Sequence, residues 1–143
     1  MDALHPDYPL PEVDHPIMKP FWDGCRAQTL LLQRDRRTGV VHWPPKPAYW
    51  KGGRLEWFRA SGRGEIYSYV VGHEPFLPAF RDLLPLIMVL VQLDEGPRLV
   101  GYMVNCTPEQ MRFGMRVQVV FKPLTAAVTL PVWEPELEPS PRT

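Results

Sequence analysis

The side chains that most often carry acid–base or metal chemistry are few in this chain and far apart. The four histidines are His5, His15, His42 and His73. None of them has the spacing of a metal site or of a catalytic triad. Cys25 and Cys106 form no CxxC pair, so they indicate neither a disulfide framework nor a zinc site, and we expect two core thiols. No Walker-type loop, G-x-S-x-G or G-x-G-x-x-G motif is present. We therefore predict no catalytic residues and no enzymatic activity of the chain by itself.

A locally basic segment is the best candidate for a ligand site. Its members are Arg34, Arg36, Arg37, Lys46, Lys51 and Arg54. One interpretation is a solvated face of the protein. The other is a site for the phosphates of a ligand, which arginine and lysine bind readily.

Apolar side chains in two segments are candidates for a partner interface. These are Phe21, Trp22, Phe76, Leu77 and Phe80. The first two fall in a predicted helix, and the others fall in the loop "GHEPFLPAFRDLLP" between two predicted strands. Each segment either packs on the rest of the chain or forms an interface, because loops on a rigid scaffold often present aromatic anchors to partners.

The composition indicates one folded domain with an appendage. A chain of 143 residues, 45% hydrophobic and 22% charged, can bury one core but not two. The formal net charge is zero, which argues against a general nucleic-acid binder. The acidic, proline-rich start is unlike a signal peptide, and the run "LLPLIMVLVQL" is too short to span a bilayer. We expect a cytoplasmic protein.

The hydrophobic pattern predicts a mainly β protein. We expect a flexible arm at 1–15, a short helix ending near residue 28, and a small knuckle that reaches residue 54. A first strand from Leu55, bent at Gly62 and Gly64, would be followed by a hairpin around "DEGPR". A short helix capped by Thr107 and two further strands complete the pattern. Five strands in this order predict an OB-fold barrel over 55–133, and we expect a disordered tail at 134–143.

Several segments together resemble the DUF35 family of OB-fold proteins associated with acyl-CoA enzymes. The resemblance rests on "PFWDGCRAQTLLLQR", the Pro44–Pro45 pair, "LEWFRASGRGEIYSYVV", "VLVQLDEGPRLVGYMV" and "MRFGMRVQVVF". It covers Pro20 to Trp133. The most specific pieces are "SGRGEIYSY" and "LDEGPRL", each of which joins a glycine-dependent bend to a strand.

The resemblance implies an N-terminal helix, a rubredoxin-like zinc ribbon and the barrel. The four cysteine positions of the family's ribbon fall on Asp35, Thr38, Tyr49 and Gly52. None of these can supply a thiolate, so we predict a degenerate ribbon without zinc. We expect the aromatic side chains of Trp43, Tyr49 and Trp50 to replace the metal by packing. The alternatives are a metal bound through Asp35, His42 and a further histidine from elsewhere, or a disordered knuckle.

The function implied by the resemblance is that of an accessory subunit. The partner would be a thiolase-superfamily enzyme, namely a thiolase, acyltransferase or aldolase that forms or cleaves a C–C bond next to an acyl-CoA. This chain would form a hetero-oligomer with that catalytic subunit and shape its acyl-CoA site, and the basic segment would contact coenzyme A. The alternative is an OB-fold that binds single-stranded nucleic acid. A free acyl-CoA carrier is a third interpretation, weakened by the lack of a deep apolar stretch.

Overall fold

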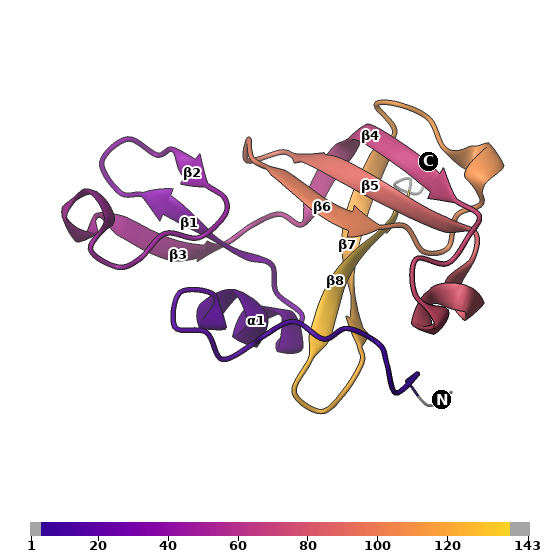
Figure 1. The fold of residues 1–143 in the computed structure, drawn as a ribbon. Helices are drawn as coiled ribbons and strands as arrows, with labels where there is room; N and C mark the ends of the chain where they lie inside the picture. Colours follow the sequence, from indigo (N-terminus) through magenta and orange to yellow (C-terminus); the bar gives the residue numbers. More distant parts are fainter. Residues whose placement is uncertain (1–3, 138–143) are drawn as a thin grey trace.

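The structure, a computed structural model, describes residues 4–137, except for the side chain of residue 51. It has two sheets with one helix between them (Figure 1). A three-stranded sheet of order β2-β1-β3 forms the knuckle, and a five-stranded sheet of order β6-β5-β4-β7-β8 forms the barrel. Of the helices within residues 4–137, none has the length and apolar character needed to cross a membrane.

Helix α1 (Lys19–Arg26) joins the two sheets. Pro20 lies in its first turn, where the missing amide costs no hydrogen bond. The buried face consists of Phe21, Gly24 and Cys25, and it packs on β1 and β8. Gly24 is required for this approach, since a Cβ there would lie 2.9 Å from the Leu31 side chain. The predicted helix is therefore confirmed.

The knuckle consists of β1 (Leu31–Asp35), β2 (Val41–His42) and β3 (Leu55–Arg59), with the short 3-10 helix η1 (Trp50–Gly53) between β2 and β3. Strand β3 pairs along the whole of β1. The predicted barrel boundary at residue 55 therefore differs from the structure, in which the barrel sheet begins at β4. The predicted single bent strand is two strands in two sheets, because the backbone turns at Gly62 with φ of +72°.

The barrel follows the predicted OB-fold order. Its strands are β4 (Arg63–Gly72), β5 (Leu86–Leu93), β6 (Arg98–Tyr102), β7 (Arg116–Pro123) and β8 (Thr129–Pro135). The 3-10 helix η2 (Pro78–Leu83) lies between β4 and β5, and η3 (Pro108–Gln110) lies between β6 and β7. A bulge between Ile66 and Ser68 bends β4. The barrel closes where Met103 bridges Trp133 and the Val104 amide donates to the Trp133 carbonyl at 2.7 Å.

The barrel core is centred on Trp133, whose side chain is fully buried. Gly101 on β6 leaves space for this ring, since a Cβ at that position would lie 2.8 Å from the indole Cδ1. Gly64 on β4 similarly allows the backbone of Gln92 on β5 to approach. Glycines in strands often mark such close approaches.

Strand β8 extends two residues past the predicted limit of the barrel at 133. The Gln118 amide donates to the Glu134 carboxylate at 3.0 Å, and Glu136 pairs with Arg116. The first residues of the predicted disordered tail thus belong to the folded sheet. Glu136 and Leu137 follow the strand, and residues 138–143 of the predicted tail lie outside the described residues.

Candidate functional site

The knuckle contains a buried carboxylate at a position where the family's ribbon carries a metal ligand. Asp35 occupies the position of the first ribbon cysteine, and its side chain is only 1% exposed. Its carboxylate accepts hydrogen bonds from Arg54 Nη2 at 3.2 Å and from the backbone amides of Arg37 at 2.8 Å and Thr38 at 3.3 Å. The three donors lie in or next to the two turns where the family's ribbon carries its zinc ligands. The hydrogen bonds to Asp35 therefore hold together the same two parts of the chain that a zinc ion would hold.

A second buried polar side chain ties the Pro-Pro loop to β1. Gln33 donates from Nε2 to the Lys46 carbonyl at 3.0 Å and accepts from the Lys46 amide at 2.7 Å. Arg36 adds a hydrogen bond from Nη2 to the Gly53 carbonyl at 3.1 Å. Buried polar groups with satisfied hydrogen bonds can rigidify a small unit that has little apolar surface. We call Gln33, Asp35 and Arg54 the polar staple.

The prediction that aromatic packing replaces the metal is wrong for two of its three residues. Tyr49 is 81% exposed and Trp50 is 36% exposed. They belong to η1 and its start, at the end of the knuckle away from the barrel (Figure 1). Trp43 does pack, but on Phe21 of α1, with ring centroids 4.8 Å apart.

The residues present do not fit a zinc ion. Of the four ribbon positions, Asp35 is already engaged by hydrogen bonds from Arg54 and from two backbone amides. The other three, Thr38, Tyr49 and Gly52, supply no thiolate or imidazole. Across residues 4–137 the structure brings together no group of three His, Cys, Asp or Glu side chains that could hold a metal. The absence of zinc stays a prediction.

We expect the purified protein to contain far less than one zinc per chain, and its thermal unfolding to be unchanged by a chelator. Structural zinc contributes directly to folding, so a zinc-dependent ribbon would lose stability when the metal is removed. Elemental analysis and thermal scans with and without chelator measure both quantities. About one zinc per chain, or a clear chelator effect, would contradict the polar staple.

The polar staple should also make the knuckle sensitive to acid. Hydrogen bonds from Arg54 and from the Arg37 amide lower the pKa of Asp35 to about 2. A lowered folded-state pKa stabilises the protein above the ordinary aspartate pKa of about 4, and this stabilisation is lost as pH falls toward about 2. Urea midpoints measured through this window should fall more steeply for the wild type than for Asp35→Asn. Equal slopes would show that the carboxylate does not hold the knuckle.

The structure divides the predicted coenzyme A-binding residues into two groups. Arg34 pairs with Glu56 at 3.1 Å, and Arg54 pairs with Asp35, so these two serve the knuckle itself. The others that the structure describes are Arg36, Arg37 and Lys46. No carboxylate within residues 4–137 lies within 4 Å of their charged groups. Lys46 lies over the ring of Trp50, 5.4 Å from its centroid. The side chain of Lys51 lies outside the described residues.

The predicted partner residues are placed differently from one another. Phe76 is 79% exposed and Leu77 is 42% exposed, as an interface requires. Phe80 is half-buried against Tyr8 of the arm, with ring centroids 5.3 Å apart. Phe21 is buried in the core and must be removed from the predicted interface, because the helix turns it toward the barrel. Its neighbour Trp22 is half-buried.

Sequence reasoning missed an apolar area on the outer face of the barrel. Val70 is 63% exposed and Val100 is 67% exposed, and the partly exposed Met88 and Leu90 lie between them on β5. The strand register places Val70 opposite Met88 and Leu90 opposite Val100, so these side chains share one face. We call these four residues the outer-face patch. Period-two alternation in "LIMVLVQL" was the signal that could have revealed it.

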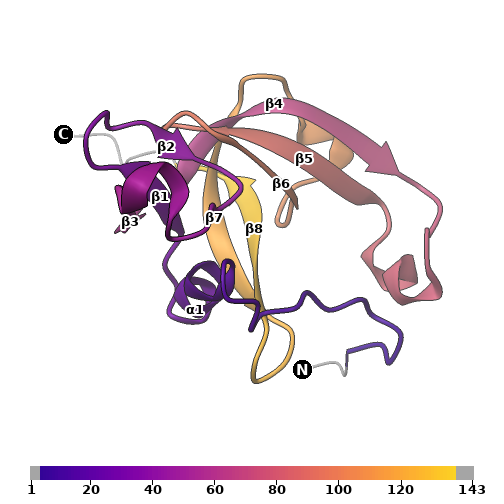
Figure 2. The ribbon, with the colours of Figure 1, turned by 60° about the vertical axis from the view of Figure 1, so that its left-hand side comes forward.

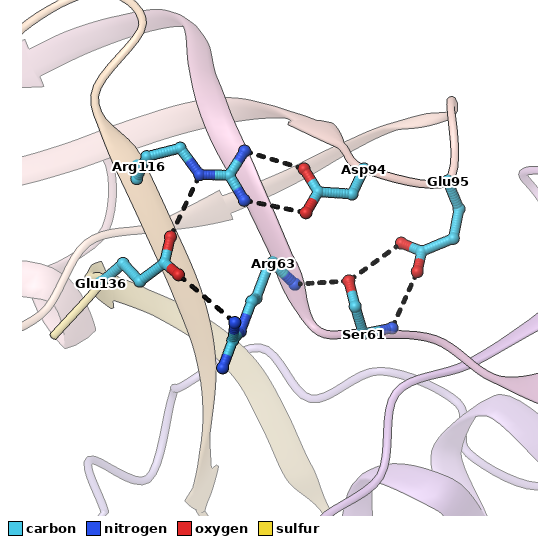
Figure 3. Close-up of polar contacts among 6 residues, drawn as sticks. All are labelled: Ser61, Arg63, Asp94, Glu95, Arg116 and Glu136. Atoms are coloured by element: carbon cyan, nitrogen blue, oxygen red, sulfur yellow. Dashed lines mark hydrogen bonds and ion pairs between the residues drawn. The ribbon is translucent and has the colours of Figure 1, made fainter. Parts of the chain in front are cut away.

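A polar network fixes the path from the knuckle into the barrel (Figure 3). Glu95 in the β5–β6 turn accepts from the Ser61 amide at 2.8 Å. Arg116 binds Asp94 with two hydrogen bonds of 2.8 Å and also binds Glu136 at 3.1 Å. Arg116 thereby lowers the pKa of Asp94. The network ties the crossover between the sheets to the turn and to the β7–β8 pair.

These features define a class of protein: a five-stranded OB-fold barrel preceded by a helix and a metal-ribbon-like knuckle. Comparison with known proteins agrees. The family model described as "ChsH2, C-terminal OB-fold domain" matches residues 57–122. A DUF35 domain-containing scaffold protein of Methanocaldococcus jannaschii is 32% identical over 106 residues, which cover 71% of this chain and 74% of the relative. The chain belongs to the DUF35 family of OB-fold proteins, and the resemblance seen in the sequence is confirmed.

Two further similarities concern larger assemblies. A probable enoyl-CoA hydratase alpha subunit of Thermomonospora curvata is 35% identical over 118 residues, or 80% of this chain. The match covers only 36% of that relative, so this chain spans just over a third of its length. A solved structure described as "Ltp2-ChsH2(DUF35) aldolase" matches with a TM-score of 0.76 and 30% identity, covering 87% of this chain and 98% of the matched chain.

Proposed function

We propose that this chain is a non-catalytic subunit of a thiolase-superfamily acyl-CoA enzyme. The observation that carries the proposal is the apolar surface of the barrel, where Val70, Val100 and the loop residues Phe76 and Leu77 are exposed. Clustered apolar side chains on a small folded chain often mark an interface. The names of the matched aldolase structure and of the M. jannaschii scaffold protein support a hetero-oligomer.

The chemistry of the complex would reside in the partner. Burial raises the pKa of the Cys25 thiol to about 12, so this side chain is a poor nucleophile near neutral pH. Burial also raises the pKa of Cys106. The polar network around Arg116 consists of satisfied ion pairs that position backbone segments. This chain would shape the partner's acyl-CoA site without supplying reacting groups.

The finer proposal concerns coenzyme A. Arg36, Arg37 and Lys46 lie on the knuckle together with the exposed rings of Tyr49 and Trp50. Arginine and lysine suit phosphate groups, so the knuckle would contact the phosphates of a coenzyme A thioester shared with the partner. Arg34 and Arg54, which serve internal ion pairs, are no longer part of this proposal.

Complex formation is the direct test of this function. The chain should be co-expressed with thiolase-superfamily subunits encoded next to it, and the mixture analysed by size-exclusion chromatography with light scattering. We expect co-elution at the mass of a hetero-oligomer. A chain that elutes alone in the presence of every such neighbour would overturn the proposal.

A further inference from the structure

A cleft of about 620 Å³ lies between the N-terminal arm, η2 and the β7–β8 turn. Figure 2 shows the arm running beneath the barrel, past this turn and toward η2. The apolar walls are Leu4, Pro6, Ala79, Leu83, Pro123 and Leu124. This volume falls within the range of small-molecule sites, which are mostly apolar with a few placed polar groups.

Lys122 supplies the cation of the cleft. It lies near the end of β7, it is half-buried, and no carboxylate within residues 4–137 lies within 4 Å of its ammonium. The ammonium is 5.6 Å from the ring centroid of Tyr102. A partly desolvated lysine without an acidic partner favours an anion nearby.

Two phenols accompany this ammonium. Tyr8 lines the cleft, and its ring packs edge-on against Phe80 at 5.3 Å. Burial raises the pKa of Tyr8 to about 12, so the hydroxyl remains a neutral hydrogen-bond donor at neutral pH. The hydroxyl of Tyr102 is buried beside that of Tyr8, and the interaction between the two phenols adds to the raised pKa of Tyr8.

We propose that this cleft binds an amphiphilic carboxylate, with the head group on Lys122 and Tyr8 and the hydrocarbon part on the apolar walls. A single ammonium beside a neutral donor matches one negative charge. The Asp82 carboxylate also lines the cleft, and because it repels two negative charges more strongly than one, it favours a monoanion over a dianion such as phosphate. The site is separate from the knuckle and from the outer-face patch, so the inference goes beyond the proposed function and does not depend on it.

Titration of the full chain with octanoate, followed by ¹H–¹⁵N NMR, tests the site. We expect saturable shifts at the amides of Tyr8, Leu83 and Lys122. A hydrogen bond to a charged group contributes about 1.5–3 kcal/mol, so Lys122→Met should weaken binding at least about tenfold. Lys122→Arg should retain it, and Lys19→Met on α1 should bind octanoate like the wild type.

Octylammonium is the charge-reversed probe and should cause no saturable shifts at these amides. Equal binding of both probes, or unchanged octanoate affinity in Lys122→Met, would overturn the site. The lack of any saturable shift up to millimolar octanoate would also overturn the site. In that case a peptide segment of a partner would be the better candidate for the cleft. Thermal unfolding of Lys122→Met checks its fold, and if that variant unfolds, the probe pair and Lys122→Arg still decide the outcome.

Discussion

Replacement of Trp133 by alanine should reduce the free energy of unfolding by about 3–5 kcal/mol, the usual cost of removing a large buried aromatic side chain. The ring is fully buried, and its residue carries the bridge that closes the barrel between Met103 and β8. Urea unfolding followed by circular dichroism measures the loss. Trp50→Ala, at a ring 36% exposed, is the matched control and should cost much less.

Gly101→Ala probes the same contact from the other side. A Cβ at Gly101 would lie 2.8 Å from the Trp133 ring, so either the ring or β6 must move, at a cost of about 1–3 kcal/mol for overpacking. The account of the core would be contradicted if Trp133→Ala cost no more than Trp50→Ala. It would also be contradicted if Gly101→Ala were neutral.

The double variant Val70→Ser and Val100→Ser should lose stable binding to the proposed catalytic partner. Anchors at the centre of an interface typically contribute about 2 kcal/mol or more each, which is more than tenfold in affinity per residue. Both side chains are more than 60% exposed, so the fold itself should change by no more than about 0.5 kcal/mol. Isothermal titration of the partner with each variant measures the loss of affinity.

Val40→Ser is the matched control for the outer-face patch. Val40 lies on the knuckle and is 52% exposed, so the chemical change and exposure are similar while the location differs. We expect it to bind the partner nearly as well as the wild type. If Val40→Ser weakened binding as much as the double variant, or if the double variant bound normally, the outer-face patch would not be the interface.

The barrel was predictable because its signals are local. Strand alternation, the turn "DEGPR" and the cap at Thr107 each depend on neighbouring residues, and all three gave the right elements. The assignment of β3 failed because it depends on a distant partner. Nothing within "LEWFR" indicates that it pairs with β1 rather than continuing into the barrel.

The knuckle was harder to predict for the same physical reason. Asp35 and Arg54 are separated by many residues, and only the folded turns bring the carboxylate and guanidinium within 3.2 Å. Aromatic composition suggested packing, but Tyr49 has no opposing layer to pack against within residues 4–137. Strand register likewise decides which basic residues form internal ion pairs, as Arg34 does with Glu56.

The most direct test of the central claim is an acyl-CoA turnover assay with three samples: this chain alone, the neighbouring thiolase-superfamily subunit alone, and the two together. The account predicts no turnover by this chain, little by the isolated partner, and full activity only when both are mixed. The mixture should lose this activity with the Val70→Ser and Val100→Ser variant, and elution profiles should show that the complex is lost. Turnover by this chain alone, or full activity of the partner without it, would contradict its proposed role as a non-catalytic subunit.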